Sequence, residues 1–300
     1  DLLRSRSMPR WTDPMLATLT SERFSSEDWI YERKLDGERC LAFRRKSRVS
    51  LLTRNEQTLN DTYPELVEAL ESQWPDRVTG EIGCDLHILQ QLQPVLRAGK
   101  WQVTVALRDG NRIVGIWPGL KDRVAGVAID VGSTTMSAHL CDMVTGDVLA
   151  STGAMNPQIR FGEDLMSRVS YGIMNPGGHL EMTAAVIDGL QKLISGAAEQ
   201  ADMAVEDVVE IVLVGNPVMH HLLLGIDPVE LGGAPFALAV DTAVEMRASE
   251  IGLEVNRGAR VYVLPCIAGH VGADAAGVVL AEAPQKAEIN TLVVDVGTNA

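Results

Sequence analysis

The 300-residue sequence has few cysteines, and the four it has lie far apart, at Cys40, Cys84, Cys141 and Cys266. No two of them form a Cys-x-x-Cys pair, the close spacing typical of zinc sites, iron–sulfur clusters and disulfide-rich domains. We therefore expect four reduced, mainly structural thiols and no iron–sulfur cluster in this chain.

Long apolar runs are also missing. No segment approaches the roughly 18 apolar residues of a membrane-spanning helix, and the N-terminus lacks the pattern of a signal peptide. These absences predict a cytoplasmic protein with no membrane partner. The chain starts at Asp1 and stops at Ala300 inside a motif described below, which indicates a fragment of a longer protein.

An excess of basic residues is absent too, since the formal net charge is −14. By count, residues 1–83 carry 13 Lys/Arg and 15 Asp/Glu, whereas residues 84–300 carry 13 and 25. Nucleic-acid binding relies on cations that displace the counterions of phosphates, so the second part is a poor partner for it. In the first part, five arginines form either a phosphate-facing patch or a solvated strand face: Arg39, Arg44, Arg45, Arg48 and Arg54.

What is present is a hydrophobic content of 46%, enough for two domains with cores. Residues 1–83 alternate like antiparallel strands at about 29–34, 38–44 and 48–53, followed by an amphipathic helix with Leu66, Leu70 and Trp74 on one side. A hairpin at Asp109-Gly110-Asn111, three strands from residue 124, a helix near 180–200 and short apolar strands follow. The pattern predicts an α/β fold class.

Lys34 stands in the segment "YERKLDGERCLAF" at residues 31–43. An unprotonated lysine amine at a strand end, before the Asp36-Gly37 turn, is able to attack the α-phosphate of a nucleotide. Read by itself, the segment is more often simply an exposed lysine before a β-turn.

The wider series "PMLATL", "ERKLDGERCLAFR", "LLTRNEQTLNDTYPELVEAL" and "GEI" resembles the start of the adenylation domain of ATP-dependent DNA ligases over residues 8–82. The resemblance implies a partial antiparallel α+β nucleotidyltransferase segment in which Lys34 becomes linked to AMP. It also implies contacts to adenine, ribose, phosphate or metal from Glu32, Arg39, Arg54 and Glu81. Nucleic acid is then a partner only if this segment is functional.

The ligase-like pattern stops after Glu81. Thr79 stands where the ligase family usually has Asp, and residues 84–300 supply neither the later lysines and glutamate nor an oligonucleotide-binding barrel. Phosphoryl transfer depends on positioning and charge stabilisation, so we expect little or no nick sealing.

Two similar turns follow apolar strands 165 residues apart, in "VAIDVGSTT" and "LVVDVGTNA". Glycine lets the backbone approach a phosphate, N–H groups and hydroxyls donate to its oxygens, and a carboxylate holds Mg²⁺ through water. A single Asp-x-Gly turn is also common in hairpins. The predicted phosphate-binding residues are Asp130, Gly132, Ser133 and Thr134 in the first copy and Asp295, Gly297 and Thr298 in the second.

The turns resemble the phosphate loops of the acetate and sugar kinase/Hsp70/actin (ASKHA) superfamily. The strings "WQVTVALRDG", "AIDVGSTT", "MNPQIRFGEDLMSRV", "VGNPVMHHLLLGIDP" and "LPCIAGHVGADAAG" further resemble the ATP-dependent reductive activators of corrinoid proteins (RACo-like). This resemblance implies a ribonuclease H-like lobe, a truncated second lobe, ATP and Mg²⁺ as cofactors, and a corrinoid protein as partner. It divides the chain into a ligase-like segment (1–83), a linker (84–122), a middle region (123–260) and the start of a C-terminal ATPase region (261–300).

Other candidates have simple structural explanations. His220 and His221 point roughly 100° apart on a helix and cannot share one metal, so we expect one packed and one surface histidine. Glu163 and Asp164, near Arg160 and Arg168, either line a cleft or begin a solvated helix.

Three hypotheses result. The first is an ATP- or phosphate-binding protein related to corrinoid activators, fused to an incomplete ligase segment and impaired in catalysis. The second is a nucleotidyltransferase that self-adenylates on Lys34 in DNA repair. The third is a scaffold whose acidic middle region binds a corrinoid protein.

Overall fold

The structure is a computed structural model of the chain, and it describes residues 40–45, 48–53, 55–73, 82–286 and 292–294. The chain divides into two compact units, residues 1–80 and 81–300. Each unit is described by itself below.

In the first unit, strands β1 (Cys40–Arg45) and β2 (Arg48–Thr53) form an antiparallel pair, with Cys40 opposite Thr53. This confirms the predicted strands at 38–44 and 48–53, whereas the strand predicted at 29–34 lies outside the described residues. Three side chains form a small buried cluster: Val49, Leu51 and Leu59.

Helix α1 (Pro64–Gln73) covers this cluster. Tyr63, Val67 and Leu70 pack against it, because positions i, i+4 and i+7 share one face of a helix. The predicted face is wrong at Leu66, which is 43% exposed.

The second unit begins with a small sheet of strand order β3-β5-β4. Its strands are β3 (Gly83–Cys84), β4 (Val103–Arg108) and β5 (Arg112–Pro118), and helix α2 (Leu86–Ala98) packs on β5. The predicted hairpin between β4 and β5 is confirmed. Asp109 and Gly110 both have positive φ, 53° and 74°, as a two-residue hairpin turn requires.

The six-stranded main sheet has the order β10-β11-β9-β6-β7-β8. Strands β6, β7 and β8 pair antiparallel, β9 is parallel to both β6 and β11, and β10 pairs antiparallel with β11. The strands are β6 (Ala125–Val131), β7 (Thr135–Asp142), β8 (Val148–Met155), β9 (Val208–Gly215), β10 (Val244–Arg247) and β11 (Arg260–Val263). The three strands predicted from residue 124 are confirmed.

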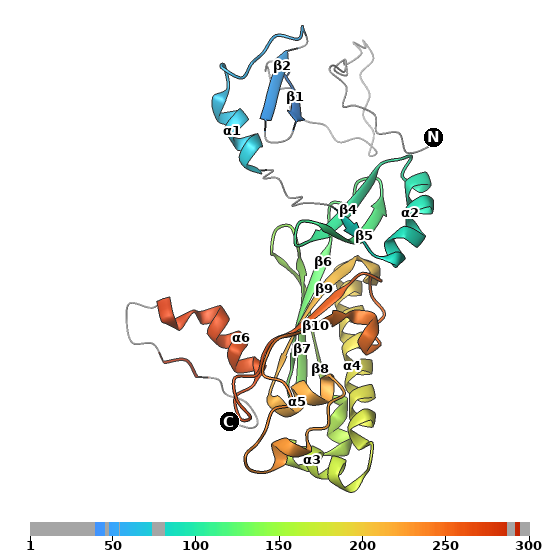
Figure 1. Cartoon of the computed structure of the whole chain (residues 1–300), viewed down its shortest axis with the longest axis vertical. Coiled ribbons are helices and arrows are strands. Elements are labelled where there is room, and N and C mark those ends of the chain that lie inside the picture. Colours follow the sequence, from blue (N-terminus) through green and yellow to red (C-terminus); the bar gives the residue numbers. More distant parts are fainter. Residues whose placement is uncertain (1–39, 46–47, 54, 74–81, 287–291, 295–300) are drawn as a thin grey trace. The chain divides into compact units, whose positions relative to one another are not determined.

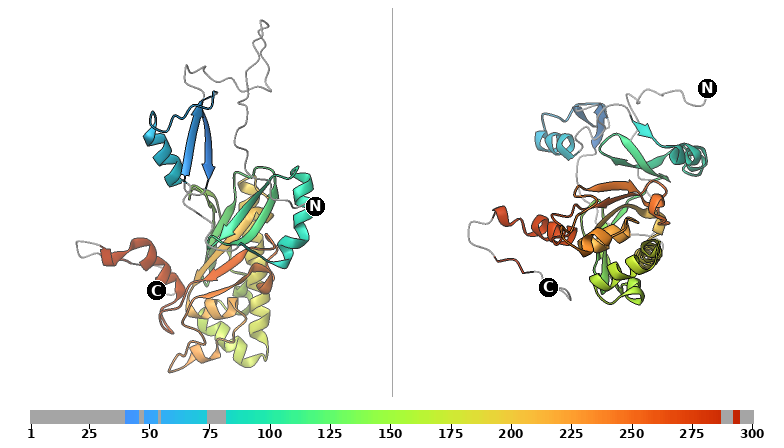
Figure 2. Two further views of the ribbon diagram at one scale, coloured as in Figure 1. Left: turned by 45° about the horizontal axis from the view of Figure 1, so that its top comes forward. Right: turned by 60° about the horizontal axis from the view of Figure 1, so that its bottom comes forward.

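Helices cover both faces of the main sheet. Helix α4 (Gly178–Gln200) packs on β7 and β8 over the main hydrophobic core, together with α3 (Leu165–Met174) and α5 (Pro217–Leu223). Helix α6 (Ala273–Glu282) packs against β9 and takes part in a second cluster on the opposite face. Figure 1 and both views of Figure 2 keep α4 and α6 on opposite sides of the sheet.

Short 3₁₀ helices complete the fold between these elements. They are η1 (Pro157–Phe161), η2 (Val205–Asp207), η3 (Val229–Gly232), η4 (Ala248–Ile251) and η5 (Pro284–Lys286). The described residues Leu292–Val294, where the sequence predicts an apolar strand before the second turn, are not in a strand.

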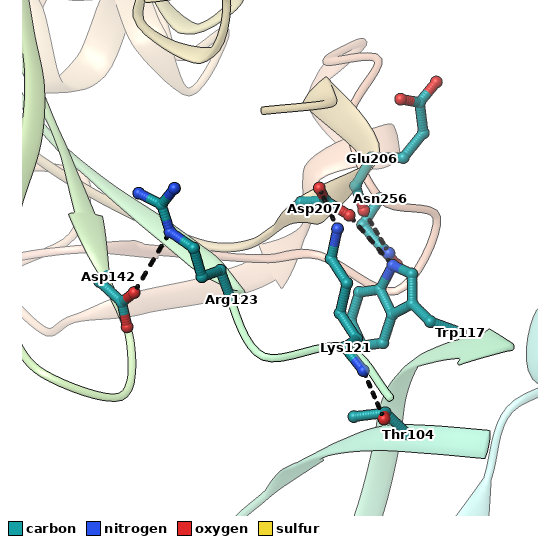
Figure 3. A network of polar contacts seen from close by, with 8 residues as sticks. All are labelled: Thr104, Trp117, Lys121, Arg123, Asp142, Glu206, Asp207 and Asn256. Carbon is teal, nitrogen blue, oxygen red and sulfur yellow. Dashed lines mark hydrogen bonds and ion pairs between the residues drawn. The ribbon is translucent and has the colours of Figure 1, made fainter. Parts of the chain in front are cut away.

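The small sheet is attached to the main lobe along a polar seam, which we define as the contacts around Asp207 and Arg108. The carboxylate of Asp207 accepts from Trp117 Nε1 at 3.1 Å and from Lys121 Nζ at 2.6 Å (Figure 3). Arg108 donates to Glu210 at 2.5 Å and to Glu245 at 3.1 Å. Backbone also meets backbone closely here, since a Cβ on Gly258 would lie 1.8 Å from the carbonyl oxygen of Val114.

The architecture is thus mixed α/β with several sheets, as the sequence predicts. Among the described residues, no helix has the length and apolarity needed to cross a membrane.

Candidate phosphate-binding site

The candidate site lies at one edge of the main sheet. Strands β6, β9 and β11 run parallel, so their carboxyl ends meet at this edge, and Val131 pairs with Gly215. Ligands of open α/β sheets bind outside the carboxyl ends of such strands. The predicted turn Gly132–Thr134 therefore stands at a favourable place.

Gly132 begins the turn between β6 and β7. A Cβ at this position would lie 2.4 Å from the carbonyl oxygen of Thr135, so no larger residue fits without a backbone shift. The Nδ2 of Asn156 donates to the Gly132 carbonyl at 2.8 Å, and the backbone N–H of Asn156 donates to the Thr134 carbonyl at 2.8 Å. Asn156 is 1% exposed, so the turn is held from inside the protein.

Arg168 supports the same turn. Its Nη2 donates to the carbonyl of Ser133, and its Nε donates to the carbonyl of Gly162 at 3.0 Å. The guanidinium is completely buried, and this burial lowers the pKa of Arg168 to about 10. A cation therefore lies directly beneath the predicted phosphate turn.

Asp130 occupies the strand end before the turn. Val127, Ile129 and Val131 face the core, while Ala128 and Asp130 are exposed, because side chains alternate along a strand. Asp130 pairs with Val214 of β9, and Val214 packs in the cluster on the α6 face. The carboxylate thus stands on the face of the sheet opposite α4.

The sequence predicts that the Ser133 hydroxyl donates to a phosphate, but the side chain of Ser133 is only 7% exposed. Burial of its side chain makes the backbone of the turn, more than this hydroxyl, the surface offered to a ligand. Thr134 is half-buried.

A second turn lies beside the first. Asn216 follows β9 and caps helix α5, since its Oδ1 accepts from the backbone N–H of Met219 at 3.0 Å. A Cβ on Gly272 would lie 2.5 Å from the Cα of Asn216, so the start of α6 rests on this turn.

Both histidines of α5 are buried, each 1% exposed, so the prediction of one surface histidine is wrong. Helix α5 is enclosed on all sides and leaves neither position at the surface. His221 Nδ1 lies 2.8 Å from the Pro217 carbonyl, and its Nε2 accepts from the backbone N–H of Ala239 at 3.0 Å. His220 forms no hydrogen bond of standard geometry with the described residues.

Burial, together with the adjacent His221, lowers the pKa of His220 to about 4, although the backbone of Leu264 acts in the opposite direction. Both imidazoles are therefore neutral at pH 7.

Asp164 begins a helix, one of the two alternatives that the sequence left open. It is the N-cap of α3, and its Oδ1 accepts from the Ser167 N–H at 2.7 Å. This hydrogen bond lowers the pKa of Asp164.

Most of the other predicted site residues lie outside the described residues. These are Glu32, Lys34, Arg39, Arg54 and Glu81 of the ligase-like segment and Asp295, Gly297 and Thr298 of the second turn. Of the predicted set, the structure places Asp130, Gly132, Ser133 and Thr134.

The cysteines do not fit a metal cluster. Within the part of the chain that the structure describes, no three His, Cys, Asp or Glu side chains come together in a metal-binding group. Cys266 is buried, which raises the pKa of its thiol to about 11, so without a metal the thiol stays protonated at pH 7.

Comparison with known proteins places this geometry in a family. The family described as "RACo middle region" matches residues 125–286, and the one described as "RACo linker region" matches residues 49–123. The chain belongs to the RACo middle region family. The candidate site, from β6 to the start of α6, lies inside this region.

Two relatives of the RACo middle region agree with this assignment. The chain is 29% identical over 217 residues to the corrinoid activation enzyme RamQ of Eubacterium limosum, covering 72% of this chain and 36% of that protein. It is similar to the solved structure of a reductive activator for corrinoid, iron–sulfur protein, with a TM-score of 0.62 and 27% identity over 86% of this chain. The chain spans 36% and 40% of the length of these two relatives.

The amino-terminal part has a different relative. Over 86 residues, 26% of this chain, it is 40% identical to DNA ligase C of Mycobacterium tuberculosis (strain ATCC 25618 / H37Rv), and the match covers 24% of that protein.

Sequence reasoning missed the residues behind the turn. Asn156, Gln158 and Arg168 lie in the string "MNPQIRFGEDLMSRV", which carried the family resemblance, but no local pattern linked them to Gly132–Thr134. The available signal was an arginine next to the apolar Val169, in the helix that begins after the cap Asp164.

Proposed function

We propose that this chain is the ATP- or phosphate-binding portion of a protein related to the reductive activators of corrinoid proteins. The phosphates bind at the turn Gly132–Thr134. The observation that carries the proposal is a glycine turn at the carboxyl ends of β6 and β9 with the buried cation of Arg168 beneath it.

The chain's own groups suit this role. Gly132 lets an anion approach the backbone, and the N–H groups of the turn act as donors. Asp130, exposed at the end of β6, would hold Mg²⁺ through water beside the phosphates. The strand order of the main sheet supports a ribonuclease H-like lobe of the ASKHA type.

Activation of a corrinoid protein needs an electron donor besides ATP. The described cysteines do not fit a cluster, so we assign no electron-transfer step to this chain. A corrinoid protein as partner is part of the proposal, because the relatives' names carry that activity. Catalysis by this chain alone is impaired.

Calorimetric titration of the 300-residue chain with ATP and Mg²⁺ tests the proposal. Gly132→Ala should weaken binding by about tenfold or more, because its Cβ meets the Thr135 carbonyl and displaces the turn. Gly153→Ala, on β8, is the matched control, since its Cβ has ordinary contact distance to the Met136 carbonyl at 3.7 Å. Absence of ATP binding by the unaltered chain, or equal binding by Gly132→Ala, contradicts the proposal.

The similarity to DNA ligase C favours a second candidate function, self-adenylation. In this reaction the unprotonated Nζ of Lys34 attacks the α-phosphorus of ATP. An N–P bond forms, the bond to the β-phosphate oxygen breaks, and pyrophosphate leaves.

Incubation with ATP labelled at the α-phosphate, followed by denaturing electrophoresis, tests this reaction. A labelled band that is lost in Lys34→Ala and kept in Lys100→Ala supports self-adenylation. No band with the unaltered chain rejects it and leaves binding at Gly132–Thr134 as the nucleotide function.

A further inference from the structure

Arg168 is an unusual buried cation, because only neutral acceptors surround it. Its Nη1 lies 3.0 Å from Met219 Sδ and 3.4 Å from Gln158 Oε1, and its other donors go to the carbonyls of Ser133 and Gly162. Asp164 acts favourably on the guanidinium, but its carboxylate caps α3, and no ion pair within 4.0 Å joins the two. A buried charge without a partner is costly, so the missing negative charge needs an explanation.

The contacts of the turn fix the direction of its peptide groups. In a trans peptide the C=O and the following N–H point in opposite directions. The carbonyls of Gly132 and Ser133 point inward, to Asn156 and Arg168. The N–H groups of Ser133 and Thr134 are therefore directed away from those two side chains. Both peptides are trans, since among the described residues only Ala234–Pro235 is cis.

A ligand on the outer side of the turn thus meets two oriented N–H dipoles with a positive charge behind them. Consecutive N–H groups of this kind form an anion-binding concavity. An anion placed there also supplies the charge that Arg168 lacks, and the low dielectric constant of the interior strengthens their attraction.

We propose that Arg168 and Asn156 are positioning residues for a phosphoryl group: they hold the carbonyls of Gly132 and Ser133 inward, so that the N–H groups of Ser133 and Thr134 face the phosphate, whose charge balances Arg168. The inference rests on the proposed function and deepens it. It assigns the sequence stretch Asn156–Arg168 to the phosphate site, although these side chains do not touch the ligand.

The experiment titrates the 300-residue chain with ATP and Mg²⁺, and separately with inorganic pyrophosphate. Arg168→Met should lower both affinities by about tenfold or more, since hydrogen bonds involving a charged group are the strong ones. Arg168→Lys keeps the positive charge but loses the planar guanidinium with its several N–H donors. It should recover part of the affinity lost in Arg168→Met. Arg160→Met is the control, because Arg160 is an exposed cation on the nearby 3₁₀ helix η1, stacked over Phe161.

Gln158→Glu keeps the proposal testable if Arg168→Met does not fold. It preserves the shape of the side chain and places a carboxylate beside Nη1 of Arg168, which neutralises the cation inside the protein. Both affinities should fall by about tenfold, although Arg168 and its contact to Ser133 remain. A purely structural role for Arg168 predicts no such loss in a folded Gln158→Glu chain.

The outcomes separate the two proposals. If Gly132→Ala loses ATP while folded Arg168→Met and Gln158→Glu chains bind like the unaltered one, the positioning role is wrong and the proposed function stands. If the unaltered chain binds neither ATP nor pyrophosphate, both are wrong. Faster amide hydrogen exchange at Ser133 and Thr134 in Arg168→Lys would further support the positioning role, and unchanged exchange would count against it.

Discussion

The turn Gly132–Thr134, our candidate phosphate site, and the polar seam use the same kind of cation in opposite surroundings. At the seam, Arg108 has the carboxylates of Glu210 and Glu245 within 3.1 Å. Burial acts to lower the pKa of Arg108, but the hydrogen bond and charge of Glu210 raise it. At the turn, Arg168 has carbonyls and a thioether, and burial lowers its pKa to about 10.

The difference separates two tasks. Charges at the seam are balanced within the chain, which holds the small sheet on the main lobe. Among the described residues, the charge at the turn has no carboxylate within 4.0 Å and only the more distant influence of Asp164, which costs stability and favours an anionic ligand. Mutations at the two places should therefore affect different measurements, stability at the seam and binding at the turn.

Gly258→Ala should have the largest effect on stability. Its Cβ would lie 1.8 Å from the Val114 carbonyl and 2.7 Å from the Val114 carbonyl carbon, so the small sheet must shift away from the lobe. We expect a loss of about 3 kcal/mol in the free energy of unfolding, measured by denaturant titration. Gly233→Ala is the control, because nothing lies within 4 Å of its Cβ. Equal stability of the two variants would mean that the backbone around Gly258 and Val114 can move apart without loss of stability.

Asp207→Ala should come next. The side chain is 6% exposed and accepts from both Trp117 and Lys121, so its removal leaves two donors without their acceptor. We expect a loss of about 2 kcal/mol in the free energy of unfolding.

Asp188→Ala is the matched control for Asp207→Ala. Its ion pair with Lys192 has the same 2.6 Å length, but the Asp188 side chain is 64% exposed, so the loss should stay near 0.5 kcal/mol. Similar losses for the two aspartates would show that the burial of Asp207 does not strengthen the seam. The proposed difference between the seam and the turn would then be wrong.

His220 should cause the smallest effect, and one that depends on pH. Its pKa is about 4 in the folded chain and 6.5 in the unfolded chain, so the unfolded chain takes up the proton first as the pH falls. The contribution of His220 to stability is complete above about pH 6.5 and is lost towards pH 4. At pH 5.5 the loss should be about 1 kcal/mol.

His220→Leu removes this titration, so its stability should fall less between pH 7.5 and pH 5.5. Thermal unfolding at several pH values measures the difference. An unchanged profile in His220→Leu would mean that His220 has the same pKa in the folded and the unfolded chain.

Local sequence patterns predicted much of the second unit. Alternation identified β6, β7 and β8, and the 3.6-residue period identified α4, whose predicted apolar positions Met182, Leu190 and Ile194 are fully buried. The motif around Gly132 could be read because its residues are contiguous. These features depend on neighbours in the chain, which the sequence displays directly.

The support of the turn could not be predicted in the same way. Arg168 is 35 positions from Ser133, and only the packing of α3 brings the two together. The burial of both His220 and His221 likewise depends on segments far along the chain, around Leu264 and Ala239. For Leu66 the period was right but the face was wrong, because the position of β2 decides which stripe is covered.

The contact between Gly272 and Asn216 has a mechanical consequence. Helix α6 starts one residue after Gly272, and there is no room for even a methyl group between that glycine and the cap of α5. A partner that displaces α6 would therefore press the backbone of Gly272 against Asn216, where the two helices meet. A displacement of α6 would in this way be transmitted directly to Asn216 and the carboxyl end of β9.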